Sequence, residues 1–198
     1  MLSPQFSLVR VTAPSALPIS VAEAKAQMRV EGNDEDTIIE RLINAAVAFV
    51  DVQGVLGFAM ITQTWGQWVG PNPGTVMLSL GPVQSVSAIK YYDINGTLQT
   101  ATLADFNVFG TPNRITVSPK TGYAWPVTQT RDDAIKIEYV IGYGATSASV
   151  PQTVRHALMM LVAHWYENRE NELIGTISKT LPFGFDDILN IERNSWYG

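Results

Sequence analysis

The stretch VRHALMMLVAHWYENRE, residues 154–170, decides the fold of the chain around it. Its apolar residues recur at i, i+3, i+4, i+7, i+8 and i+11, which is the spacing of one broad helix face. They are Val154, Ala157, Leu158, Leu161, Val162 and Trp165. Because Met159, Met160 and Tyr166 add apolar surface outside this face, the helix is predicted either to be central to a core or to share its surface with a neighbouring subunit.

Upstream, the spacing of Ser20 and Glu23 matches a capping box, in which each side chain bonds the backbone N–H of the other residue. This pair predicts a first helix over about 21–30. Gly32 is expected to stop it with a positive φ.

A second helix is predicted to begin at the acidic residues Asp34 and Asp36 and to end near Gly54. Its apolar residues recur at helical spacing. They are Ile38, Ile39, Leu42, Ile43, Ala46, Phe49 and Val50. The short connection to the first helix favours an antiparallel helical hairpin.

From Met60 onward, short segments rich in Val, Ile, Thr and aromatic residues alternate with Gly, Pro, Asn and Asp. The segments predict six or seven strands: MITQTWGQWV, TVMLSL, QSVSAIKYYD, TLQTAT, FNVFG, RITVS and AIKIEYVIGY. Asn95-Gly96 predicts a type I′ hairpin turn. Pro151 then suits the first turn of the long helix.

The predicted fold class is therefore α+β. A small helical bundle over residues 17–54 and 150–198 contains two N-terminal helices, one long C-terminal helix and a short terminal helix. A β-rich insertion, residues 58–145, lies between its second and third helices. The last part of the bundle, 180–198, contains the breakers Pro182 and Gly184, which separate its short terminal helix from the long helix.

Composition limits the function. A net charge of -5 and a pI near 5.0 argue against a phosphate-gripping surface, and the absence of cysteine excludes disulfides and Cys-ligated zinc. The longest apolar run, Ala157–Ala163, is far shorter than the roughly 20 residues that span a bilayer. The N-terminus has no signal-peptide pattern. We expect a soluble protein that is not exported by that route, with neither a membrane segment nor a cofactor.

No catalytic or metal motif stands out. His156 and His164 lie two helical turns apart, and His164 with Glu167 would still need a third ligand. GYGATSA lacks the lysine and spacing of a phosphate loop. Trp65 and Trp68, three apart in a predicted strand, should point to opposite faces, which disfavours a sugar-stacking platform.

Several segments together resemble the head-tail connector (adaptor, or head completion) proteins of long-tailed bacteriophages, prophages and gene-transfer agents. They are LPISVAEAKAQMRV, DEDTIIERLINAAVAFV, ITQTW, VRHALMMLVAHWYENRE and LPFGFDDIL, and the resemblance runs from Leu17 to about Trp196. It implies a non-enzymatic virion protein, assembled in the host cytoplasm. Typically twelve copies form a ring beneath the portal protein, which joins capsid to tail and extends the DNA channel. The implied fold is a helical bundle with a variable insertion.

The resemblance also implies partners and sites. The portal protein and a tail or stopper protein would bind the ring, and DNA would pass through it without specific binding. In this family the C-terminal segment engages the portal, so residues 180–198 are the predicted partner-binding segment. Its portal-interface candidates are Leu181, Phe183, Phe185, Ile188, Leu189, Trp196 and Tyr197. The candidate acids facing the channel are Asp34, Glu35, Asp36 and Glu40, for which a solvated helix start is an equally good explanation.

Two other interpretations stay open. The chain could be another phage structural or assembly factor, such as a tail completion protein, or a metal-dependent enzyme that uses His156, His164 and Glu167. The C-terminal segment could also fold back on its own bundle.

Overall fold

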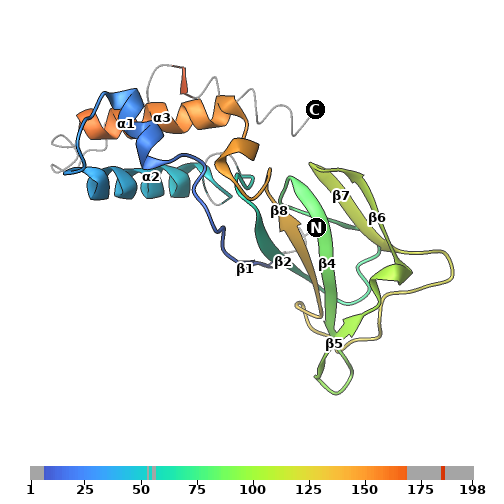
Figure 1. The fold of residues 1–198 in the computed structure, drawn as a ribbon. Coiled ribbons are helices and arrows are strands. Elements are labelled where there is room, and N and C mark those ends of the chain that lie inside the picture. Colours follow the sequence, from blue (N-terminus) through green and yellow to red (C-terminus); the bar gives the residue numbers. More distant parts are fainter. Residues whose placement is uncertain (1–6, 53, 55–56, 169–183, 186–198) are drawn as a thin grey trace. The chain divides into compact units, whose positions relative to one another are not determined.

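The computed structural model describes residues 7–52, 54, 57–168 and 184–185. The chain divides into two compact units, each formed by two stretches of sequence. A β unit comprises residues 1–15 and 62–142, and a helical unit comprises residues 16–61 and 143–198. The fold is thus mixed α and β, with antiparallel sheets (Figure 1).

Three α-helices pack together in the described part of the helical unit: α1 (Val21–Met28), α2 (Asp36–Val50) and α3 (Gln152–Glu167). Their shared core includes most of the residues that the helical spacing predicted. Val154, Ala157, Leu158, Leu161 and Val162 of α3 are fully buried, as are Ile39, Ile43, Ala46 and Val50 of α2. Trp165 is partly buried at the edge of this core. The amphipathic spacing therefore predicted the inward face of α3 correctly and most of that of α2, where Phe49 is 38% exposed.

The helix ends differ in detail from the sequence prediction. The capping box of Ser20 and Glu23 is present, but α1 stops at Met28, and the left-handed residue that closes it is Arg29, with φ 57°. Gly32 is also left-handed, at φ 73°, but lies further along the connection. The expected terminal helix within 180–198 lies outside the described residues, apart from residues 184 and 185.

The β unit contains two antiparallel sheets. One has the order β1-β2-β8-β4-β5 and the other β3-β7-β6. The strands are β1 (Ser7–Thr12), β2 (Gln63–Val69), β3 (Val76–Met77), β4 (Val83–Tyr92), β5 (Leu98–Ala101), β6 (Phe106–Thr111), β7 (Arg114–Pro119) and β8 (Ile135–Ile141). Short 3₁₀ turns precede β6 at Leu103–Asp105 and α3 at Ser147–Ser149.

The central strands β2 and β8 show why this unit folds. Ile135, Ile137, Tyr139 and Ile141 alternate along β8 and are fully buried. Trp65 of β2 lies opposite Tyr139 on the same face and is also buried, whereas Trp68 lies opposite Lys136 on the other face. The prediction that the two tryptophans point to opposite faces is therefore confirmed.

Two sequence-based expectations about the β unit need correction. The first is that its strands form only an insertion between α2 and α3: β1 precedes α1 and pairs with β2 at the edge of the larger sheet. The second is the type I′ turn, because of the two turn residues only Gly96 has a positive φ. The Asp93 carboxylate accepts hydrogen bonds from the backbone N–H groups of Asn95 and Thr97, and this stabilises a different turn.

The segments that connect the two units run side by side where they belong to the helical unit. Ile61 and Gly144 form an isolated parallel β-bridge, and the Met60 carbonyl accepts a hydrogen bond of 3.2 Å from the Tyr143 N–H. Both ends of the β2–β8 segment are therefore tied at one place in the helical unit.

Candidate functional site on the helical unit

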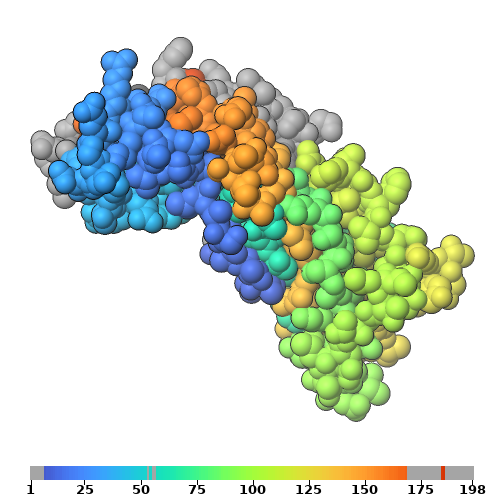
Figure 2. Space-filling view, viewed as in Figure 1, coloured from blue at the N-terminus to red at the C-terminus, as the bar shows by residue number. Residues whose placement is uncertain are grey.

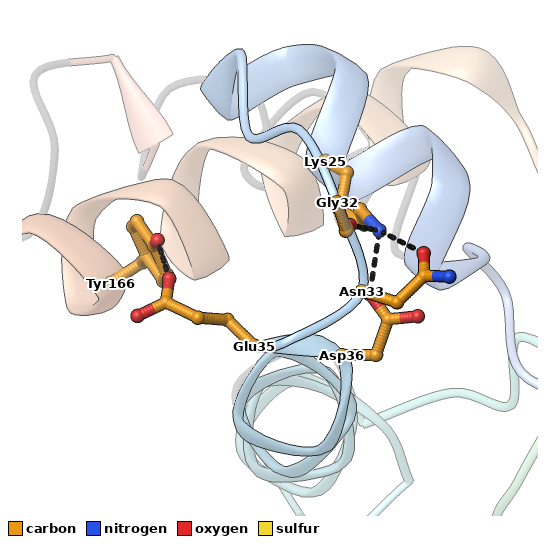
Figure 3. A network of polar contacts seen from close by, with 6 residues as sticks. All are labelled: Lys25, Gly32, Asn33, Glu35, Asp36 and Tyr166. Carbon is orange, nitrogen blue, oxygen red and sulfur yellow. Dashed lines mark hydrogen bonds and ion pairs between the residues drawn. The ribbon is translucent and has the colours of Figure 1, made fainter.

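The predicted acidic site extends from the connection between α1 and α2 into the first turns of α2, and Lys25 bonds to both parts (Figure 3). The Lys25 ammonium donates to the Gly32 carbonyl, to Asn33 Oδ1 at 3.1 Å and to Asp36 Oδ1 at 2.6 Å. The Lys25 side chain is only 15% exposed. Because one partly buried ammonium group binds three acceptors, it holds the segment between α1 and α2 in place and neutralises the charge of Asp36 within the helical unit.

Two further contacts tie the N-terminal helices to α3. The Tyr166 hydroxyl donates to the Glu35 carboxylate at the start of α2 (Figure 3). Arg155 donates to the Glu23 carboxylate, which also accepts from the N–H and hydroxyl of Ser20. The hydrogen bond from the Ser20 N–H is the main reason why the pKa of Glu23 lies below its ordinary value. Burial acts in the opposite direction and raises this pKa, whereas the Ser20 hydroxyl and the charge of Arg155 lower it further. The capping box of α1 is thus also an anchor for α3.

These contacts divide the four predicted channel acids. Glu35 and Asp36 are partly buried and bonded to Tyr166 and Lys25, so they serve the internal structure of the unit. Asp34 and Glu40 are exposed. The sequence could not separate the two pairs, since the bonding partners lie on other helices.

The acidic charge of the chain belongs to the helical unit. Its residues include seven Lys and Arg against thirteen Asp and Glu, a net charge of -6. The β unit includes six Lys and Arg against five Asp and Glu, a net charge of +1. The two values add up to the -5 of the whole chain. A surface that repels phosphate is therefore expected on the helical unit.

The predicted partner-binding segment is described at only two residues, Gly184 and Phe185. The Phe185 side chain is fully buried and belongs to the same core as α2 and α3. Phe185 was predicted as a portal anchor, but its ring is packed inside its own unit, because a large aromatic side chain gains more from burial than from exposure. The other candidates, Leu181, Phe183, Ile188, Leu189, Trp196 and Tyr197, lie outside the described residues.

Within the part of the chain that the structure describes, the helix histidines do not come together with other potential metal ligands. His156 and Glu167 are exposed, and His164 is partly buried with its Nδ1 3.3 Å from the Asn168 amide. In the described ranges, no group of three His, Cys, Asp or Glu residues is arranged to hold a metal ion. Nor does any described helix have the length and apolar character needed to cross a membrane.

The outer face of the larger sheet has a cluster of charges and rings that the sequence did not reveal. Glu138, whose side chain is 10% exposed, lies 2.8 Å from the Lys136 ammonium and 3.0 Å from that of Lys90. Burial would raise the pKa of Glu138, but the bonds to Lys136 and Lys90 outweigh it, and the net shift is downward. The Trp68 and Tyr92 rings stack beside these charges with centroids 5.8 Å apart. The rings pack on each other, which argues for a structural role.

The chain is similar to one protein family and to several solved structures. The model of the head completion protein family matches residues 18–180. The comparison with curated protein sequences finds no significant match. Among solved structures, the fold is similar to chains in the neck or virion of gene transfer agent particles.

The similarity covers almost the entire length of each chain. For the neck of an empty gene transfer agent particle, computed with C6 symmetry, the TM-score is 0.76 at 21% identity, over 94% of this chain and 95% of that one. For the virion of a native particle it is 0.73 at 21% identity, over 94% of both chains. For the neck of a native particle, computed with C12 symmetry, it is 0.67 at 20% identity, again over 94% of both.

The fold is thus one found in virion neck components. Because the family model covers most of its length, the chain belongs to the head completion protein family, whose role at the connection of head and tail is structural.

Proposed function

We propose that this protein is a structural connector that forms a ring beneath the portal and joins the capsid to the tail. The observation that carries the proposal is the family match over residues 18–180. Supporting it, the fold is similar to chains in gene transfer agent necks at TM-scores of 0.67 and 0.76. The proposed location is accordingly the head-tail interface of the virion, after assembly in the host cytoplasm.

The proposed ring contains twelve copies. The neck structures with similar chains were computed with C6 and C12 symmetry, which supports a ring of six-fold or twelve-fold order. Closed cyclic symmetry gives each copy two different faces, one for each neighbour. The portal protein would bind one end of the ring, and a tail or stopper protein the other.

The ring would extend the DNA channel, with the helical unit supplying acidic residues to its wall. The net charge of -6 on the helical unit supports this role, because a basic wall would hold the phosphates. Asp34 and Glu40 are the strongest candidates of the four predicted acids, since both are exposed. DNA would then pass without specific binding.

Portal binding is proposed for the C-terminal part of the helical unit, residues 180–198. Its apolar anchors would be Leu181, Phe183, Ile188, Leu189, Trp196 and Tyr197, without Phe185, which lies in the core. We expect deletion of residues 193–198 to leave a folded subunit that no longer binds the portal protein. Circular dichroism would check the fold and sedimentation with portal the binding; unchanged binding would reject this assignment.

The proposed role needs no catalysis. We expect purified protein to contain no stoichiometric zinc or manganese by metal analysis. We also expect His164→Ala to sediment with the portal as the unmodified protein does. Bound metal that the His164→Ala variant loses would instead support the enzyme hypothesis.

The binding partner separates the proposal from its nearest rival. In a sucrose gradient, the protein should move to the position of the portal protein from the same genome and should not move with purified tails alone. Sedimentation with tails, and not with portal, would favour a tail completion protein.

A further inference from the structure

Two edge strands of the β unit, β1 and β6, are six residues long and have one side that pairs with no other described strand. Among the described strands, the edges belong to β1 and β5 in the larger sheet and to β3 and β6 in the smaller one. β3 has two residues and β5 four, whereas β1 and β6 have six each. A free edge exposes backbone N–H and C=O groups that can pair with another chain.

β1 has little of the protection that such edges usually carry. Every residue of the strand is exposed, including Leu8, Val9 and Val11 at 37–45%. The strand contains no proline, lysine or acid, and its one charge, Arg10, lies 5.9 Å from the centre of the Trp65 ring. A bulge disturbs the pairing only between Arg10 and Thr12. The stretch from Ser7 to Arg10 is therefore open to a further strand.

β6 combines a free edge with an apolar surface. Phe109 is 79% exposed and Val108 47%. Phe109 lies opposite Thr116 of β7, which in turn lies opposite Met77 of β3, so these three residues form a row on one face of the small sheet. Met77 is 51% exposed. β6 itself contains no charged residue, and exposed Phe and Met side chains are typical of the centre of a protein interface.

Both strands reach the surface of the molecule in Figure 2, β1 in dark blue and β6 in yellow-green. They differ in sequence and belong to different sheets of one unit. A head-to-tail contact in a ring needs two such different surfaces on each copy. Together, β1 and β6 therefore provide the two different surfaces that a head-to-tail contact needs, which one edge strand alone would not.

The charge distribution indicates which molecule covers these edges. Neighbouring copies of the helical unit, at -6 each, repel one another, whereas copies of the β unit, at +1, hardly do. Contacts that hold like copies together are therefore favoured between β units. A nucleic acid is disfavoured, since β1 and β6 contribute one cation between them.

We propose that β1 of one copy pairs with β6 of the next copy, so that the large sheet of one subunit continues into the small sheet of its neighbour. The proposal rests on the proposed function, because it presupposes the ring. Side-chain contacts with Phe109 would add to the backbone hydrogen bonds between the strands. Every copy would then use one edge toward each neighbour.

Site-directed cross-linking tests this pairing, because the chain contains no cysteine of its own. Val9→Cys and Val108→Cys subunits are mixed, assembled on the portal protein and treated with a short bis-maleimide. We expect a two-subunit product in the mixture and in neither variant alone. A subunit that contains both substitutions should give a ladder of longer products.

A matched control uses Leu98→Cys, which places an equally exposed cysteine, at 48%, on the free edge of β5. It should give no product with Val108→Cys. An annular layer on the portal without the Val9–Val108 product would refute the strand pairing and leave the connector function intact. A product from Val108→Cys alone would also refute it, because it indicates a symmetric contact. If no layer forms, the connector function fails and the pairing fails with it.

An interface variant gives a second readout. We expect Phe109→Ser to raise the protein concentration needed to load the portal by about tenfold, the effect of losing a central aromatic anchor. Tyr123→Ser, at a residue of the β unit that is 57% exposed, should leave loading unchanged. Equal loading by both variants would show that Phe109 lies outside the interface.

Discussion

Phe185 offers a sharp test of how the C-terminal segment is held. Its side chain is fully buried in the core that α2 and α3 share, although it stands in a stretch with breakers on both sides of Phe183. Phe185→Ala removes the ring and leaves a cavity, which in a close-packed core costs about 3–5 kcal/mol. Urea unfolding followed by circular dichroism at 222 nm reports this loss, because the described α-helices all belong to the helical unit.

Phe49→Ala is the matched control in the same unit. Phe49 is 38% exposed and makes an edge contact with Trp165 at 6.1 Å, so its loss should cost about 1 kcal/mol. Phe185→Ala should therefore lower the free energy of unfolding by several times as much as Phe49→Ala. Equal costs would refute the conclusion that Phe185 anchors the segment in the core.

Glu138→Gln should destabilise the β unit by about 1–2 kcal/mol at neutral pH, because two lysines lose a largely buried partner. The loss stays this small because Lys90 is one-third exposed and water screens its charge. Since the folded-state pKa of Glu138 lies below the ordinary 4.5, this difference should be complete well above pH 4.5 and vanish as pH falls through the folded-state value; unfolding curves of both proteins across this range measure it, and a difference that is independent of pH would contradict the assignment. Ser20→Ala should cost about 1 kcal/mol of helical-unit stability in thermal unfolding at 222 nm, whereas Ser20→Thr, which keeps the capping oxygen, should retain most of it. An alanine variant as stable as the unmodified protein would show that the capping box contributes little.

The sequence predicted the features that local patterns control. The helical face of α3 and the cap of α1 depend on residues within a few positions of each other, and both were found as expected. The seven described strands between α2 and α3 each lie in or overlap a segment singled out by its Val, Ile, Thr and aromatic content. Alternation along β8 matches the burial of its four apolar residues on one face, but not the burial of Glu138 on the other.

Long-range partners could not be predicted. β1 was not expected as a strand because only its pairing with β2, more than fifty residues away, makes it one. The same holds for the ion pair of Glu23 with Arg155 and the bond between Glu35 and Tyr166, which join opposite ends of the chain. The separation of the four channel acids into bonded and exposed pairs followed only once these contacts were known.

Electron microscopy of this protein mixed with the portal protein from the same genome tests the central claim most directly. The connector function predicts a new annular layer against the portal, absent from portal alone, with matching rotational symmetry. Class averages without added density, under conditions in which both proteins are folded and concentrated, would contradict it.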